Sequence, residues 1–217
     1  MSLVIALDGP AGSGKGTVTS IIAEKLGLTN IDTGAMYRCV ALKCIEENID
    51  LEDKEKIIEI SKRVKIEFNK DKNVFLDGVD VSKRIRDKDV SGIVSPISSI
   101  VEVREELVNQ MRKLAEGNNV IMEGRDITTV VFPNADYKFY IDASIEERAQ
   151  RRYKQNIESG IEMSYEEVKD SIMKRDYNDM HKEVGSLMRT DDQIYIDTTN
   201  MTIDEVVEEI LKNIEGV

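Results

Sequence analysis

The sequence predicts an α/β fold with a parallel sheet of about five strands and helices on both of its faces. Three observations lead to this prediction: short apolar runs alternate with amphipathic segments, a glycine-rich turn joins the first run to the first helical segment, and capping residues open the later helices. The length of 217 residues suits one such unit with small mobile inserts. Hydrophobic residues make up 41% and charged residues 33%, which is typical of a globular chain and not of a disordered one.

The first elements are a strand and three helices. Residues 3–7 form an apolar run that ends at Asp8-Gly9, which predicts a buried strand. Helices are expected next over residues 15–26, 34–47 and 51–62. In the first of these helices the apolar residues fall on one face, namely Val18, Ile21, Ile22 and Leu26.

The pattern then changes to short alternating runs. Residues 64–68 alternate clearly, residues 74–76 do so less clearly, and Asp77-Gly78 is a turn signal. Together they predict a small antiparallel patch inserted into the α/β chain. A helix over residues 101–115 returns the chain to the main body. Further strands are expected over residues 120–122 and 137–141.

The later helices begin at capping boxes, in which a Ser or Thr is followed three residues on by Glu. The three pairs are Ser144 with Glu147, Ser164 with Glu167, and Thr202 with Glu205. A strand over residues 193–197 is expected between the second and third of these helices. In a parallel sheet of this kind, ligands bind beyond the carboxyl ends of the strands.

The net charge of −12, from 30 Lys and Arg against 42 Asp and Glu, argues against a nucleic-acid partner, because backbone binding depends on basic surfaces. A small anionic ligand stays open. No run approaches the roughly 18 apolar residues of a membrane span, and no basic stretch precedes an apolar segment, so neither a membrane partner nor a secretory signal is expected. Cys39 and Cys44 point away from each other on a predicted helix, and we expect buried thiols in a reducing cytoplasm.

A phosphate-binding loop is predicted between the first strand and the first helix. Glycines let a backbone wrap closely around phosphates with its N–H groups inward, and the helix N-terminus adds partial positive charge. Lys15 can bridge the β- and γ-phosphates of a nucleotide. The strict pattern has Ser or Thr directly after the lysine, whereas Gly16 intervenes here. The loop consists of Gly9, Pro10, Ala11, Gly12, Ser13, Gly14, Lys15, Gly16 and Thr17.

The loop indicates a nucleoside triphosphate but leaves the reaction open. A GTPase would carry Asn-Lys-x-Asp for guanine, and residues 69–72 have Lys where that Asp belongs. Residues 89–92 match a short Asp-x-x-Gly pattern, but two fixed positions make a weak signal. A GTPase is therefore disfavoured.

Arginines gather in four places although the chain is acidic. Phosphoryl transfer requires a protein to position groups and neutralise charge, and the planar guanidinium grips two oxygens at once. Arg38 and Arg125 each follow a predicted strand end or segment end, where ligands bind. Two helical faces carry the other groups, the first with Arg148, Arg151 and Arg152 and the second with Arg175, Asp179 and Lys182. Each face, taken alone, is also explained as a solvated surface with ion pairs.

Together these motifs resemble those of bacterial cytidylate kinases, nucleoside monophosphate kinases of the P-loop type, over essentially the whole chain. The first motif is shared with many kinases, whereas the combination is specific. The antiparallel insert near residues 64–81 also resembles the enlarged acceptor domain of these enzymes. The motifs are Gly-Pro-Ala-Gly-Ser-Gly-Lys-Gly-Thr at 9–17, Asp-Thr-Gly-Ala-Met-Tyr-Arg at 32–38, Glu-Gly-Arg-Asp at 123–126 followed by Thr-Val-Val-Phe-Pro, Asp-Ala-Ser-x-Glu-Glu-Arg-Ala-x-Arg-Arg at 142–152, and Arg-Asp-x-x-Asp at 175–179.

The resemblance implies a P-loop kinase fold and transfer of the γ-phosphoryl group of ATP to CMP or dCMP. A monomer is the default expectation, because the sequence does not indicate an oligomeric state. Mg²⁺ would be held mainly through the nucleotide phosphates, with no dedicated protein metal site. The implied parts are a core of residues 1–33, 101–147 and 164–217, an acceptor-binding insert of residues 34–100 and a helical lid of residues 148–163. ATP would be bound by the loop with Lys15, and the lid arginines Arg148, Arg151 and Arg152 would act in catalysis. The acceptor would be bound by Thr33, by Arg38 and Arg125 at its phosphate, by Ser95, Arg104 and Asp126 at cytosine, by Arg175 and Asp179 at the ribose, and by Lys182.

The chain departs from the family pattern at Lys182, where an arginine is expected, at Ser186, where a proline is usual, and at Thr128, where a glycine is usual. Lys182 keeps the charge but lacks the two-pronged guanidinium. One rival function is a kinase on the same scaffold with UMP, AMP or a hydroxy acid as acceptor. A second is a catalytically silent nucleotide sensor, which would keep Lys15 and lose the lid arginines. A nucleic-acid-binding ATPase is disfavoured by the net charge.

Overall fold

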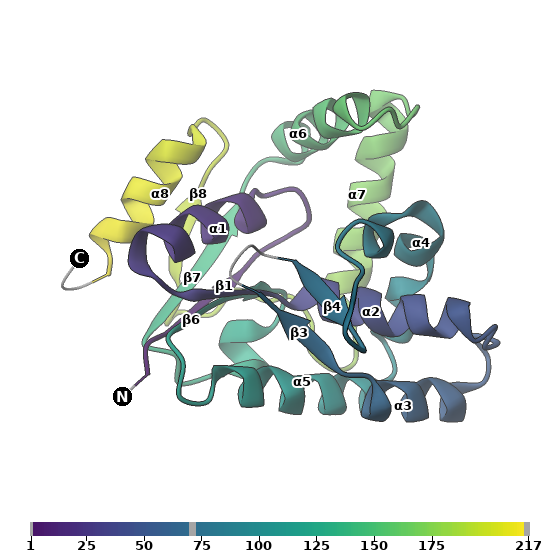
Figure 1. The fold of residues 1–217 in the computed structure, drawn as a ribbon. Coiled ribbons are helices and arrows are strands. Elements are labelled where there is room, and N and C mark those ends of the chain that lie inside the picture. Colours follow the sequence, from purple (N-terminus) through teal and green to yellow (C-terminus); the bar gives the residue numbers. More distant parts are fainter. Residues whose placement is uncertain (1, 70–72, 215–217) are drawn as a thin grey trace.

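The computed structural model describes residues 2–69 and 73–214, and its centre is a five-stranded parallel sheet with helices on both faces (Figure 1). The strands are β1 (Val4–Asp8), β2 (Thr29–Asp32), β6 (Val120–Gly124), β7 (Tyr137–Asp142) and β8 (Ile194–Asp197). They lie in the order β2-β6-β1-β7-β8, and each neighbouring pair is parallel. The predicted α/β architecture is confirmed. Residues 70–72 of the run compared above with a guanine motif lie outside the described residues.

The helices that cover the sheet are α1 (Lys15–Leu26) and α8 (Ile203–Lys212) on one face and α2 (Thr33–Glu46) and α5 (Val101–Ala115) on the other (Figure 1). The central strand β1 is buried on both faces. Ile5 and Leu7 pack in the cluster that contains α1 and α8, whereas Ala6 packs in the cluster that contains α2 and α5. Because both faces are covered, this strand is a continuous apolar run and does not alternate with polar residues. α1 and α5 have the bounds that the sequence predicts.

The predicted antiparallel insert contains a three-stranded sheet in the order β3-β4-β5. Its elements, with the helices around it, are α3 (Lys54–Arg63), β3 (Ile66–Phe68), β4 (Val74–Leu76), β5 (Val79–Asp80), the short helix η1 (Arg84–Arg86) and α4 (Lys88–Ile97). Asp77 and Gly78 connect β4 to β5 with φ angles of 50° and 83°. Two successive left-handed residues form the hairpin turn whose twist matches that of the strands. The turn signal at these residues is therefore confirmed.

Several elements were not predicted, namely α4, β2 and the short helices η1 and η2 (Ile127–Val131). α4 contains Gly92 and Pro96, both poor helix formers, and its stability comes from Val90 and Ile97, which are fully buried beside α2. β2 has one buried residue, Ile31, and is a strand because it pairs with β6. For α4 and β2, packing against distant parts of the chain outweighs the local pattern.

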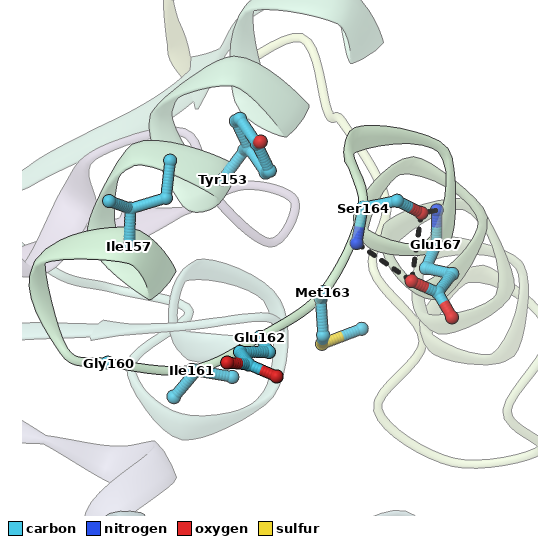
Figure 2. A pocket seen from close by; sticks show the side chains of 8 residues that line it. All are labelled: Tyr153, Ile157, Gly160, Ile161, Glu162, Met163, Ser164 and Glu167. Atoms are coloured by element: carbon cyan, nitrogen blue, oxygen red, sulfur yellow. Dashed lines mark hydrogen bonds between the residues drawn. The ribbon is translucent and has the colours of Figure 1, made fainter.

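α6 (Ile145–Glu158) and α7 (Tyr165–Met180) stand beyond the carboxyl edge of the sheet and pack on each other through Ala149, Val168 and Ile172 (Figure 1). The segment predicted as a lid contains most of α6 and the connection to α7. An open cavity of about 570 Å³ lies at this connection (Figure 2). It is lined by Tyr153, Ile157, Gly160, Ile161, Glu162, Met163, Ser164 and Glu167.

Two of the three predicted capping boxes are complete, those of Ser164 and Thr202. At the third, Ser144 Oγ accepts a hydrogen bond from the backbone N–H of Glu147, but the Glu147 carboxylate accepts from Arg151 Nε at 2.8 Å.

Cys39 and Cys44 are buried free thiols, as predicted. Within residues 2–69 and 73–214, no helix combines the length and the apolar character needed to cross a membrane.

Candidate active site

The predicted motifs meet at the carboxyl edge of the parallel sheet. β1 ends at Asp8, directly before the phosphate loop, and β2 ends at Asp32, directly before α2. Glu123 of β6 pairs in register with Asp32 on one side and with Leu7 on the other. Since neighbouring parallel strands end side by side, the loop, the start of α2 and residues 123–126 surround one location.

The phosphate loop has the backbone that its glycines predict. A Cβ atom on Gly9 would lie 2.0 Å from the carbonyl oxygen of Ile141, so this position accepts only glycine. Gly12 and Gly14 have φ angles of 79° and 89°, a region that glycine adopts without strain. Gly14 then caps the N-terminus of α1, whose free N–H groups form an anion-binding end.

Lys15 is the first residue of α1, and its side chain lies inside the loop with 4% of its surface exposed. Its Nζ donates to the carbonyl oxygens of Gly9 and Pro10, both at 2.8 Å, and to Ser13 Oγ at 3.1 Å. Burial and then the positive charge of Arg125 lower the pKa of Lys15 to about 7. A phosphate bound in the loop would favour the charged ammonium.

Two carboxylates, those of Asp32 and Glu123, lie next to the loop. Arg38 Nη2 donates to Asp32 Oδ2 at 2.7 Å, and Thr33 Oγ1 donates to the Glu123 carbonyl oxygen at 2.8 Å. Burial and the charge of Asp32 raise the pKa of Glu123. Glu123 Oε1 lies only 2.9 Å from the place where a Cβ atom on Gly16 would stand. The sequence analysis did not assign Glu123 a role, although a charged residue near the end of a buried strand was an available signal.

Asp179 of α7 gathers three of the predicted acceptor residues. It accepts from Arg125 Nε at 2.8 Å and from Lys182 Nζ at 3.0 Å, and Arg175 Nε lies 3.9 Å away. Arg175 remains 55% exposed. Although the side chain is half exposed, its guanidinium lies among other charged groups, and partial desolvation and then the like charge of Arg125 lower the pKa of Arg175. The three cations therefore lie close enough to act on one anion.

Arg104 and Asp126 form a buried ion pair, with 4% and 6% of their surfaces exposed. Burial raises the pKa of Asp126, and the charge of Arg104 opposes this rise. The Arg104 guanidinium also lies 5.6 Å from the centre of the Tyr37 ring. Arg104 Nε is buried without a hydrogen-bond partner among the described residues. Gly185 covers the pair, because a Cβ atom there would lie 1.9 Å from Arg104 Nη2.

The serine beside this pair is Ser98. Its carbonyl oxygen accepts from Arg104 Nη1 at 3.1 Å, and its Oγ accepts from Lys182 Nζ at 3.2 Å. Ser95, the serine that the resemblance implies, is exposed on α4, and its carbonyl oxygen accepts from Ser98 Oγ at 3.1 Å. The sequence analysis assigned no role to Ser98.

The three arginines of α6 differ in their surroundings. Arg148 is buried and donates from Nε to the carbonyl oxygen of Ala143 at 2.9 Å. Arg151 donates to Thr198 through both Nη atoms, at 3.1 and 2.7 Å. Arg152 makes no hydrogen bond or ion pair with any residue in the described ranges. Of the three, Arg152 is therefore the one available to a ligand.

Replacing Lys182 by alanine is expected to raise the acceptor KM by about tenfold, because it removes one partner of a mostly buried ion pair with Asp179 beside the acceptor residues. Lys182→Arg keeps the charge and should stay active. Steady-state kinetics with varied acceptor measures both effects. Unchanged kinetics in the alanine variant would remove Lys182 from the site.

A glycine loop around a buried lysine at the end of a parallel strand, with arginines and carboxylates from the adjacent strand ends around it, is the arrangement of a P-loop kinase. Such an enzyme is an ATP-dependent phosphotransferase. Residues 5–216 match the cytidylate kinase family, and the chain belongs to that family.

Curated relatives that match this chain over nearly their whole length are also named cytidylate kinase. The cytidylate kinase of Caldanaerobacter subterraneus subsp. tengcongensis is 50% identical and covers 99% of this chain and 95% of its own. That of Clostridioides difficile is 46% identical and covers 98% of both chains. A solved structure of an uncharacterized protein from Eubacterium ventriosum matches at 13% identity and a TM-score of 0.53 over 100% of both chains, a likeness that concerns the fold alone.

Proposed function

We propose that the protein transfers the γ-phosphoryl group of ATP to CMP or dCMP and releases ADP with CDP or dCDP. The observation that carries the choice of base is the Arg104–Asp126 pair, in which Arg104 Nε is a donor without a partner among the described residues and Asp126 has a second carboxylate oxygen besides the one that accepts from Arg104. Cytosine offers the complementary groups, an amino donor at N4 and acceptors at N3 and O2. An ADP-release assay with CMP, dCMP, UMP, AMP and GMP tests this function and separates it from that of a kinase with another small acceptor.

ATP is proposed to bind with its β- and γ-phosphates in the loop of residues 9–17. The left-handed glycines and the N-terminus of α1 support this, because they direct N–H groups and partial positive charge into the loop. In this proposal the Lys15 ammonium, which now donates to loop carbonyls, donates to the phosphates.

The acceptor phosphate is proposed to bind between Arg38 and Arg125. Arg38 Nε is buried and lacks a hydrogen-bond partner among the described residues, so an anion would relieve the cost of an unpaired donor. Arg125 comes from the adjacent strand end, and Arg175 lies next to it. A phosphate acceptor is already an anion, so the reaction needs positioned cations and no general base.

Mg²⁺ is proposed to bind next to Asp32 and Glu123. Their oxygens are of the type that Mg²⁺ prefers, and Glu123 faces Gly16, directly after the lysine of the loop. When bound, the ion would neutralise charge on the transferring phosphates. The nucleotide phosphates would supply most of its ligands, because both carboxylate oxygens of Asp32 already accept hydrogen bonds, one from the Ala35 N–H and one from Arg38.

Movement of the insert and the lid completes the proposal. Arg104 and Asp126 are nearly buried beneath the segment around Gly185, so the base reaches them only when that segment moves. We propose that the acceptor-binding insert of residues 34–100 and the lid of residues 148–163 move together with this segment, which lies outside both ranges. Closure would then exclude water, which competes for the phosphoryl group.

We further propose that the enzyme acts as a monomer in the cytoplasm, whose reducing environment suits the free thiols of Cys39 and Cys44.

CMP is expected to be preferred over UMP by at least about tenfold in kcat/KM. A buried charged group left without its partner costs about 1–3 kcal/mol or more, and each 1.4 kcal/mol is a factor of ten. Uracil has an oxygen in place of the amino group, and it would face the Asp126 carboxylate without a hydrogen between them. Asp126→Asn keeps the shape and can donate to that oxygen, so it should lose most of the preference by harming CMP more than UMP. Equal kcat/KM values for CMP and UMP in the wild-type enzyme would refute this role of Asp126 and leave the kinase assignment standing.

A further inference from the structure

A second buried ion pair contacts the phosphate loop. Arg148 of α6 donates from Nη1 to Asp176 of α7, and both side chains are buried. Asp176 directly follows Arg175 in the Arg-Asp-x-x-Asp motif. No role in the proposed reaction has been given to it so far.

This pair holds both polar groups of one loop residue. Arg148 Nη1 donates to the carbonyl oxygen of Ala11 at 3.0 Å, and the N–H of Ala11 donates to Asp176 Oδ1 at 3.3 Å. The next residue, Gly12, is in close contact with α6, because a Cβ atom there would lie 3.2 Å from both the Cβ and the carbonyl oxygen of Arg148. The tip of the loop is thus attached to α6 and α7 at Ala11 and Gly12.

We propose that Asp176 is a positioning residue that keeps the phosphate loop in the shape that binds the nucleotide phosphates. The inference rests on the proposed use of ATP by this loop. Glycine-rich backbone has many accessible conformations, so a loop with glycine at 9, 12 and 14 loses more entropy on ordering than other segments. Holding Ala11 from both sides removes part of that cost before the nucleotide binds.

The charges of the pair suit this position. An isolated carboxylate next to the loop would repel phosphates, whereas the Arg148–Asp176 pair has no net charge. Arg148 is further fixed by its bond to the Ala143 carbonyl oxygen at 2.9 Å. The sequence analysis placed Arg148 among the lid arginines that meet the phosphoryl group, but in this arrangement its guanidinium is directed to Ala11.

If Asp176 only joined α6 to α7, breaking another ion pair between these two helices should have the same effect on nucleotide binding. The same two helices are joined elsewhere by Lys169 of α7 and Glu146 of α6, whose Nζ and Oε1 are 3.0 Å apart. This pair is more exposed and makes no contact with the loop. Glu146→Gln is therefore a matched control that weakens the helix pair and leaves Ala11 untouched.

The test is Asp176→Asn in the full chain. The amide oxygen can still accept from the Ala11 N–H, but Arg148 loses its countercharge and its fixed position. We expect the Kd for a fluorescent ADP analogue and the KM for ATP to rise about tenfold, with the CMP KM changed less than about twofold. Glu146→Gln should match the wild type in all three quantities.

Wild-type nucleotide affinity in a folded Asp176→Asn variant would overturn the proposal, as would equal losses for ATP and CMP or the same loss in Glu146→Gln. If Asp176→Asn does not fold, Arg148→Lys gives the same readout, because a lysine cannot contact Ala143, Ala11 and Asp176 at once. Binding of the ADP analogue is measured without an acceptor, so this measurement tests the role of Asp176 alone. If CMP is not the acceptor, the wild-type enzyme will show no turnover with CMP.

Discussion

Lys15→Ala is expected to give a folded protein whose turnover is lower by roughly 10²-fold or more. In the free protein the ammonium donates to three oxygens of the loop, which marks the place where phosphate oxygens would accept from it. Burial and Arg125 lower its pKa to about 7, so the charged form is costly before a phosphate is bound and loss of the side chain should cost little stability. Steady-state kinetics and thermal unfolding measure the two effects.

Lys25→Ala is the control for this variant, because Lys25 is an exposed lysine in the last turn of the same helix and lies outside the loop. It should have wild-type turnover. A folded Lys15→Ala enzyme with near wild-type turnover would refute the assignment of the phosphate loop. Proton uptake gives a second readout. Bound phosphates should raise the pKa of Lys15 from about 7, so ATP binding near pH 8 should take up protons in the wild type and fewer in the variant.

Arg152→Ala is expected to lower kcat by roughly 10²-fold while the KM for ATP changes much less. Arg152 makes no hydrogen bond or ion pair within the described part of the chain, and its charge contributes to the lowered pKa of Arg175. Its guanidinium is therefore not held by a protein partner there and is available to a ligand. We expect its guanidinium to contact the transferring phosphoryl group when the lid closes, an interaction made in the transition state and not in the ground state. Single-turnover measurements at saturating ATP would isolate this step.

Arg151→Ala is the matched comparison, since Arg151 is the neighbouring residue of the same helix and is already bonded to Thr198 and Glu147. Its kcat should fall less than that of Arg152→Ala. If alanine at 151 and at 152 leaves turnover unchanged, neither side chain contacts the phosphoryl group and the lid assignment is wrong.

The helices and strands that could be predicted from the sequence are those whose pattern of apolar residues is complete within one segment of the chain. The helices over residues 15–26 and 101–115 carry a full apolar face, and the structure has them with the same bounds. β2 and α4 could not be predicted in this way. Ile31 alone does not make an apolar pattern, and Gly92 with Pro96 argues against a helix, so both elements depend on partners far away in the chain.

The candidate site shows the same division. Lys15 and Arg125 could be selected from sequence because they come after predicted strand ends and parallel strands end at one edge, whereas Arg38 was selected as an arginine at a segment end. The partners of these residues could not. Asp179 accepts from both Arg125 and Lys182, and Ser98, just after α4, accepts from Lys182, just after α7, because these parts of the chain come together only in the folded protein.

By itself, the sequence determined the sheet, the phosphate loop and the family, because each depends on residue types at short, regular spacing. Only the tertiary structure decided which of three neighbouring arginines is available, since spacing places Arg148, Arg151 and Arg152 on one helical face without naming their partners. Asp176 and Ala11 are 165 positions apart, and no local pattern connects them. Packing of α6 and α7 against the end of the sheet brings them together, buries Arg148 and leaves Arg152 available to a ligand.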